Sequence, residues 1–579
     1  MELRRREGER PVLREHLAVV LAAAAVATSA LLGLSMDVPV ALVAGLVIVA
    51  VVRRPVVIVL AVAAVTGARA DDAVAALAVP APERVDGIAV LVSDPAPRFF
   101  ALQAIVDVDG RRYVADIPND QAGAVRSMLT GERVRLEGRT RDLDDAPRSW
   151  VLSRHLAGRL SVRSIEPYGS GPPWYRAANL VHRTISTGAG SMGDERASLY
   201  TGLVLGDDRA QSDLVRFRFE ASGLTHLLAV SGQNVAFVLA VAAPLLRRAG
   251  PRSRLVASGV LLVLFVLVTR AEPSVLRAAV MAAVAIAAVT SGRAVSGLRV
   301  LCLTVMAVLV VDPLLVHSVG FRLSVCATGG LLVLAGPLAD RLPGPEWLRL
   351  PLAVTIAAQV ATAPLLLALA GGVPSVAVVT NLLAGPAAGA VMMLGVTVGM
   401  LAGVVRQPWS GLLQIPTELL VRWVDWVAAA GSRAPMATLG PARFVVLLCV
   451  GVLAVVVARR IERAGPRVVL VVVAASVALW AVWPPATPVG RHDLGNGSSV
   501  SVGDCGVVVE VHGAAGPGDA LESLWHLGVR RADLVVAGEG QRNRAAAAVV
   551  AEQFDAAVRT VDDASRPQGG AAATRPACG

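Results

Sequence analysis

Polar side chains recur inside the apolar part of this sequence. The stretch Gly223–Val235, GLTHLLAVSGQNV, opens a long apolar run yet carries hydrogen-bonding groups, and others follow downstream. A charge at the centre of a bilayer costs about 2.5–3.5 kcal/mol, so such residues persist where they face protein or water. The residues from which we predict a hydrated path are His226, Ser231, Gln233, Asn234, Arg277, Arg322 and Asn381.

Two of these side chains, Arg277 and Arg322, are cations and are the candidates for binding an anion. Glycine and proline lie beside the polar residues in SGQN, EPS, GGVPS and NLLAGP, and broken helices with polar residues are typical of conduits through membranes. The alternative is that each polar side chain hydrogen-bonds a neighbouring helix. The set as a whole favours the path.

Apolar segments long enough to cross a bilayer must position these residues. The chain has 579 residues, is 55% hydrophobic and has a mean hydropathy of +0.62. Repeated apolar runs near the spanning length of roughly 17–25 residues predict a polytopic α-helical membrane protein with about 13 spans. The predicted spans are 17–34, 38–52, 56–67, 222–243, 255–270, 273–291, 297–311, 321–338, 351–370, 374–404, 409–430, 443–459 and 468–484. Segment 374–404 is interrupted by Gly385-Pro386, so it is either a re-entrant piece followed by a helix or a single crossing.

Arginine predicts the orientation of these spans. All 54 basic residues are arginine, and they gather before the first span and in alternate loops of the later ones. Because positive charge marks cytoplasmic loops, the N-terminus is expected in the cytoplasm. The segment that follows the third span, and the C-terminal tail, are then expected outside it.

The segment 80–168 differs in kind from the spans. Short runs with alternating apolar residues, such as GERVRLEGRT, predict about five strands, and Asp109-Gly110 predicts a hairpin. Strands this short and close favour a small extracytoplasmic OB-like β-barrel. Residues 126–163 hold nine arginines and five acids, so one face could meet a phosphate backbone, or be an ordinary solvated surface.

These observations predict five regions. They are N-terminal transmembrane helices at 1–70, the OB-like domain at 80–168, amphipathic interfacial helices at 172–221, a transmembrane channel domain at 222–486, and a small α/β tail at 487–579.

Four motifs in order resemble the ComEC family of competence proteins. They are THLLAVSGQNV, EPSVLRAAVM, DPLLVHSVGFRLSVCATGGLLVL and AAQVATAPLLLALAGGVPSVAVVTNLLAGP. The resemblance implies an inner-membrane channel that conducts single-stranded DNA into the cytoplasm, served by an extracytoplasmic DNA receptor and a cytoplasmic helicase-type ATPase. The resemblance implies pathway or structural roles, not catalytic ones, for the residues on family motif positions, which are His226, Ser231, Gly232, Arg277, Arg322, Ser324 and Asn381. Family members often carry a second histidine after SG, where this chain has Gln233-Asn234.

The tail departs from what the family resemblance implies. Many members end in a metallo-β-lactamase-like domain, but here AGEGQR, residues 537–542, stands where its metal-binding histidines and aspartates belong. A hydrolytic metal site needs several converging ligands, and His492, His512 and His526 are scattered. We therefore expect a degenerate remnant with no metal, no cofactor and no enzymatic activity; hydrolysis of phosphodiesters by the tail is the opposing hypothesis.

The sequence contains no P-loop and no dinucleotide fingerprint, so transport is expected to depend on an external motor or a gradient. A second function remains open. Broken helices with internal arginines fit a transporter of a small anionic solute equally well, although such a transporter does not need an external barrel. The partners predicted for a DNA channel are single-stranded DNA and membrane lipid.

Overall fold

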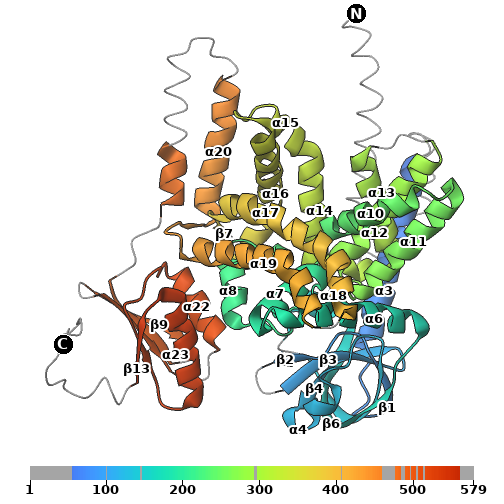
Figure 1. Ribbon diagram of the computed structural model, residues 1–579, viewed down its shortest axis with the longest axis horizontal. Helices are drawn as coiled ribbons and strands as arrows, with labels where there is room; N and C mark the ends of the chain where they lie inside the picture. The colour runs from blue at the N-terminus through green and yellow to red at the C-terminus, as the bar shows by residue number, and fades with distance from the viewer. Residues whose placement is uncertain are drawn as a thin grey trace, which may run out of the picture. The chain divides into compact units, whose positions relative to one another are not determined.

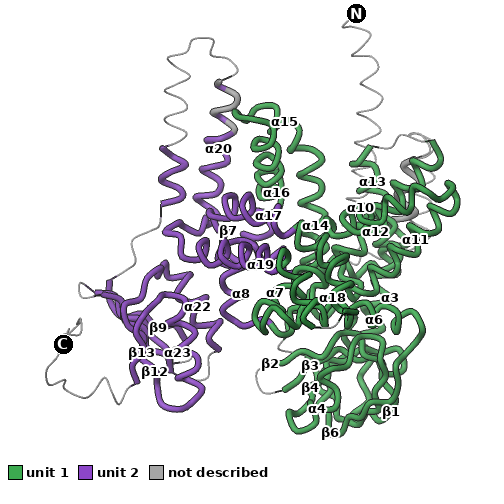
Figure 2. Tube along the Cα trace, viewed as in Figure 1, with its two compact units in different colours: residues 1–210, 229–362, 389–417 green, residues 211–228, 363–388, 418–579 purple. Residues whose placement is uncertain are grey.

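The computed structural model divides into two compact units (Figure 2). The first comprises residues 1–210, 229–362 and 389–417, and the second comprises 211–228, 363–388 and 418–579. The structure describes residues 55–98, 101–143, 146–292, 296–405, 407–458, 476–483, 489–495, 497–503, 506–512 and 516–560. The predicted spans 17–34 and 38–52, and half of 468–484, lie outside these residues.

A closed sheet forms within 80–168, in the first unit. Its strands are ordered β1-β5-β6-β4-β3-β2, and β1 also pairs with β3. That last pairing closes five strands into a ring around buried side chains such as Leu102, Ile117, Leu136 and Leu160. The elements are β1 (Arg84–Leu91), β2 (Ala96–Arg98), β3 (Ala101–Val108), β4 (Arg111–Pro118), α4 (Asn119–Val125), β5 (Arg133–Arg141), α5 (Arg148–Arg154) and β6 (Leu156–Gly169).

The predicted hairpin at Asp109-Gly110 is confirmed. Val108 pairs with Arg111 at the end of the β3–β4 ladder. Asp109 and Gly110 have φ angles of 52° and 80°, the left-handed conformation that a two-residue turn of this kind requires. Aspartate tolerates that conformation better than most side chains, and glycine has no Cβ to clash.

The remaining elements of the first unit are helical, and several appear in Figure 1. Those before the first long apolar helices are α3 (Pro55–Ala78), α6 (Pro173–Gly188), η1 (Ala189–Ser191) and α7 (Asp194–Leu205). Those that follow are α10 (Gly232–Leu246), α11 (Pro251–Val268), α12 (Pro273–Thr290), α13 (Gly297–Val311), η2 (Pro313–His317), α14 (Val319–Gly330), η3 (Leu331–Ala335), α15 (Gly336–Ala339), α16 (Glu346–Ala370), α17 (Ala377–Leu394), η4 (Gly395–Gly399) and α18 (Met400–Val404). The last residues of α16 and the first of α17 belong to the second unit.

Five helical segments are long and apolar enough to cross a membrane, among the described residues. They are Pro251–Val268, Pro273–Thr290, Val319–Ala339, Glu346–Ala370 and Ala377–Val404, and shorter apolar helices are Gly232–Leu246, Gly297–Val311 and Pro441–Gly451. This architecture fits a membrane protein. The predicted span 222–243 follows α8 (Asp213–Ala221) and is interrupted, since the short helix α9 (Thr225–Leu228) ends before α10 begins at Gly232.

Of the two alternatives for segment 374–404, the structure has the continuous one, and the break at Gly385-Pro386 is absent. Helix α17 continues through Pro386 and passes through the π-helical turn η4 into α18. Proline has no N–H, so the carbonyl of Leu382, four residues earlier, loses its helical donor. The next carbonyl, that of Leu383, accepts a hydrogen bond from Trp423 Nε1 at 3.0 Å.

The predicted span 409–430 forms one helix, α19 (Trp409–Arg433), but it is amphipathic rather than uniformly apolar. Val421, Val424 and Val427 are buried. Glu418, Arg422 and Asp425 add charge to the middle of the helix. One face instead exposes six large apolar side chains, namely Trp409, Leu412, Ile415, Leu419, Trp423 and Trp426. This distribution is typical of a helix at a membrane surface rather than of a crossing one.

Glycines at every fourth position bring α17–α18 into close contact with α6 and α7. A Cβ added to Gly395 would lie 2.4 Å from Val204, and one on Gly399 would overlap the Tyr200 hydroxyl at 2.0 Å. One on Gly403 would lie 1.9 Å from the Thr184 carbonyl oxygen. Small residues at this spacing allow helix backbones to approach closely in membrane proteins.

The second unit contains the C-terminal sheet, ordered β13-β12-β11-β10-β9. Strands β11, β12 and β13 are parallel, and β9–β10–β11 are antiparallel. Helix α8 packs into the core of this sheet through Leu214, Phe217 and Ala221. The elements are β7 (Val373–Pro374), β8 (Thr438–Leu439), α20 (Pro441–Ala458), β9 (Gly490–Gly495), β10 (Ser498–Gly503), β11 (Gly506–Val511), α22 (Pro517–His526), β12 (Leu534–Ala537), α23 (Gln541–Phe554) and β13 (Ala557–Thr560).

Candidate functional site

Arg277 lies at the centre of a polar cluster between apolar helices of the first unit. It is on α12, which packs against α10 and α14, and is 4% exposed. Its Nε and Nη2 donate to the Ser324 Oγ of α14 at 3.0 and 2.7 Å. Its Nη1 lies 2.8 Å from the Met281 sulfur. The guanidinium group is thus held by neutral partners.

The start of α10 forms the other side of this cluster. Ser231 precedes the helix, and its hydroxyl donates to Oδ1 of the buried Asn234 at 3.2 Å. Gly232 is the first helical residue, and a Cβ there would lie 3.0 Å from Nη2 of Arg277. The absence of a side chain at Gly232 therefore leaves room for the guanidinium at the N-terminus of α10, which is the positive end of the helix dipole. A positive charge there is unfavourable unless an anion binds beside it.

No carboxylate forms an ion pair with Arg277 within the part of the chain that the structure describes. Burying a charge without a counter-ion is costly, and such a residue in a candidate span marks a functional site by default. The electrostatics of the cluster fit a bound anion.

The other predicted path residues lie elsewhere. Gln233 is exposed on α10, and Arg322 donates from Nη2 to the His317 carbonyl at 3.4 Å. His226 and Asn381 belong to the second unit, where Asn381 donates to the carbonyls of Ala377 and Gly223. The structure therefore brings together five of the nine predicted residues: Ser231, Gly232, Asn234, Arg277 and Ser324.

Sequence reasoning missed two members of the cluster. Ser274 donates to the Val230 carbonyl at 2.7 Å and ties the start of α12 to the chain before Ser231. Met281 lies one helical turn after Arg277. The motif EPSVLR contains Ser274, but only the fold shows which carbonyl it binds.

A second polar network joins the barrel to the helices of the first unit. Asp94, after β1, accepts from Arg270 Nε at 2.9 Å and from the backbone N–H of Thr130 at 2.6 Å. Arg270 lies between α11 and α12 and donates to Asn179 of α6 at 2.8 Å. Arg209 binds Asp207 through two hydrogen bonds at 2.7 and 2.6 Å. Buried charges here are paired, unlike Arg277.

The same network contains the side chains whose geometry comes nearest to a metal site among the described residues. Ligand atoms of Asp94, His182 and Asp207 lie within 4.8 Å of one another. However, Arg270 and Arg209 already form ion pairs with the two carboxylates. A cation would have to compete with both guanidinium groups, so the donor set fits an ion-pair network better than a metal.

His182 makes the stability of this network depend on pH. Burial, followed by the charge of Arg270, lowers the pKa of His182 from 6.5 to about 4. The unfolded chain therefore takes up a proton below pH 6.5 that the folded chain refuses until about pH 4. We expect about 2 kcal/mol of stability to be lost between pH 7 and pH 5. Thermal unfolding across this range measures the loss.

The control for that prediction is His526, an exposed histidine of α22. His182→Gln should flatten the profile between pH 7 and pH 5, whereas His526→Gln should leave it unchanged. Equal slopes in both variants and the parent chain would contradict the assignment.

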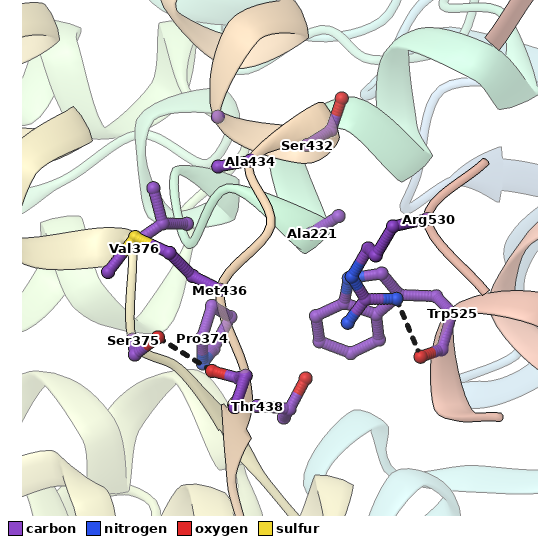
Figure 3. Close-up of a pocket in the computed structure, with 12 residues that line it drawn as sticks. Ala221, Pro374, Ser375, Val376, Ser432, Ala434, Met436, Thr438, Trp525 and Arg530 are labelled. Carbon is purple, nitrogen blue, oxygen red and sulfur yellow. Dashed lines mark hydrogen bonds between the residues drawn. The ribbon is translucent and has the colours of Figure 1, made fainter. Parts of the chain in front are cut away.

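A small pocket in the second unit does not contain the predicted path (Figure 3). It lies between the paired strands β7 and β8 and the segment with Trp525 and Arg530. Arg530 Nη1 donates to the Trp525 carbonyl at 2.8 Å, and its guanidinium lies over the Trp525 ring. None of the nine predicted residues lines it.

The fold and the cluster define a helical protein that fits a membrane, with a buried unpaired arginine among its apolar helices. Residues 203–463 match the family described as Competence protein, which supports the resemblance to competence proteins and suggests a role in DNA uptake. The matched region contains every predicted path residue. No curated protein and no solved structure matches the chain.

Proposed function

We propose that the chain is a membrane channel that conducts single-stranded DNA into the cytoplasm during natural transformation. The observation that carries this proposal is Arg277, a buried cation with no carboxylate partner, facing Ser324 and the start of α10. The backbone of DNA carries one phosphate per nucleotide, and a fixed arginine is suited to bind each in turn. Since Arg277 is 4% exposed, this conformation is the closed state of the path.

The barrel supports the same function. We infer an OB-like barrel from two features: helix α4 lies between β4 and β5, and β4 pairs with β6 in parallel. Such barrels often bind single strands of nucleic acid. We place the barrel and the tail outside the cytoplasm and the N-terminus inside, in a multi-pass inner-membrane protein, following the arginine-rich loops.

Partners and the tail complete the proposal. An extracytoplasmic DNA receptor delivers DNA and a cytoplasmic helicase-type ATPase pulls it, since no nucleotide-binding motif occurs in the sequence. The tail is not a hydrolase in this proposal. His492 is on β9, His512 follows β11 and His526 ends α22, so they come from separate elements.

Deleting the gene tests this function. We expect fluorescent DNA to bind the cell surface as before but to reach the nuclease-resistant interior at background level, because the only route through the inner membrane is gone. The full-length chain should restore import. Normal import in the deletion strain would refute the proposal.

A transporter of a small anionic solute is the alternative, and Arg277 fits it as well. Proteoliposomes distinguish the two. A channel for DNA should pass a labelled oligonucleotide under a membrane potential. Flux of inorganic phosphate with no flux of oligonucleotide would favour the alternative.

A further inference from the structure

The outer face of β5 carries a row of arginines. Arg133, Arg135, Arg139 and Arg141 point outward and alternate with the buried Val134 and Leu136, as the two-residue period of a strand requires. Two neighbouring strands extend the row. We name the six residues the arginine strip: Arg84, Arg133, Arg135, Arg139, Arg141 and Arg163.

The arginine strip has an excess of positive charge. None of its six members forms an ion pair within the described residues. Arg84 of β1 lies directly opposite Arg139 of β5, and like charges in that position destabilise a sheet. Three acids share the face with the six arginines: Asp86, Glu137 and Glu166, of which Glu166 lies opposite Arg135. An anion that bridges the arginines would relieve this repulsion.

The opposite side of the barrel is different. OB-like proteins usually bind their ligands on the second and third barrel strands, which are β3 and β4 here. On those strands Arg112 lies 4.0 Å from Asp107. Arg159, on β6, pairs with Asp116 of β4 at 3.5 Å. Acids thus lie beside Arg112 and Arg159, and Arg111 of β4 donates to the carbonyls of Pro80 and Val79, whereas the arginines of β5 form no ion pair within the described residues.

An aromatic residue lies at one end of the arginine strip. Tyr168 precedes Gly169, which pairs with Arg133, and its side chain is 55% exposed. Ile88 lies directly opposite Arg135 and is 45% exposed. Positive charge along a line, with an aromatic ring beside it, is the combination that binds single strands independently of sequence.

We propose that the arginine strip binds the phosphate backbone of a single nucleic-acid strand, with Tyr168 stacking on a base. This rests on the proposed function and specifies where the strand first meets the chain. The linear arrangement favours a nucleic acid over a lipid surface, because successive phosphates lie along one line as the strip does.

Binding of a fluorescent oligo-dT to the full chain in detergent micelles tests the proposal. Arg135→Gln with Arg139→Gln should weaken binding about tenfold. The slope of log affinity against log salt should fall by about 1.4, since each phosphate contact to a single strand contributes about 0.7. Tyr168→Ala should weaken binding while leaving the salt slope unchanged.

The matched control is Arg247→Gln with Arg248→Gln, two exposed arginines at the end of α10. This pair should retain both the affinity and the slope. Unchanged affinity and slope in the strip variant would overturn the proposal. So would a strip variant that keeps oligo-dT binding but loses binding to phosphatidylglycerol vesicles, because the face would then be a lipid surface.

Failure of this inference and failure of the proposed function are distinguishable. Import that persists in the deletion strain refutes the function but not the binding face. Unaltered oligo-dT binding by the strip variant refutes the face, while lost import in the deletion strain still supports the function.

Discussion

Replacing Arg277 with methionine should reduce import of labelled DNA at least tenfold at an unchanged amount of protein in the membrane. The variant removes a buried charge that has no carboxylate partner. Replacing buried charges by apolar groups of similar volume is often neutral or stabilising, so the fold should persist. A hydrogen bond to a charged group contributes about 1.5–3 kcal/mol, which corresponds to roughly 10–150-fold in transport. Quantitative uptake with immunoblotting measures both quantities.

Two companion variants sharpen this test. Arg277→Lys keeps the charge but loses the planar fork that Ser324 now accepts, and it should give intermediate import. Arg252→Met removes an exposed arginine near the start of α11 and should have no effect. Normal import by Arg277→Met would show that the side chain serves helix packing alone.

Replacing Arg270 with methionine should destabilise the first unit by about 3–5 kcal/mol, because it leaves the largely buried carboxylate of Asp94 without its nearest cationic partner. The hydrogen bond to Asn179 is lost at the same time. Arg209, 3.9 Å from Asp94, compensates only in part. Thermal unfolding of the full chain measures the loss, and proteolysis should cut between the barrel and the helices sooner than in the parent.

A double-mutant cycle separates the ion pair from packing. Asp94→Asn combined with Arg270→Met should recover part of the loss, since no unpaired charge then remains. Arg531→Met, which breaks an exposed pair with Asp533, should cost at most about 1 kcal/mol. A loss below about 1 kcal/mol for Arg270→Met would contradict a tightly docked barrel.

Local features of this fold could be predicted from sequence, whereas long-range pairing could not. The hairpin at Asp109-Gly110 follows from two residues, and the outward arginines of β5 follow from their alternation with buried ones. Arg270, Asp94 and Asn179 each read as ordinary loop or helix polar residues. Asp94 is 176 positions from Arg270 in the sequence and Asn179 is 91 positions from it, so only the fold brings the three together.

Most members of the polar cluster could be predicted from sequence, but their contacts between helices could not, because those contacts are long-range. Ser231, Gly232 and Asn234 are neighbours in sequence, and Arg277 and Ser324 are polar residues inside apolar runs. Sequence shows such residues but not which of them face each other. Gln233 illustrates this limit, because one step along α10 turns its side chain outward while Asn234 is buried. Pro386 shows another, since the sequence alone does not tell whether a helix stops at a proline or continues through it, as α17 does.

The shared core of α8 and the C-terminal sheet has a consequence for anyone who shortens the chain. Leu214 and Phe217 belong to the same apolar core as Val509 and Leu521. Removing the last hundred or so residues would therefore expose the apolar face of α8 to solvent. Such a truncation would invite aggregation or degradation, and its phenotype would say little about what the tail does. Single substitutions on the outer surface of the sheet are the cleaner way to ask that question.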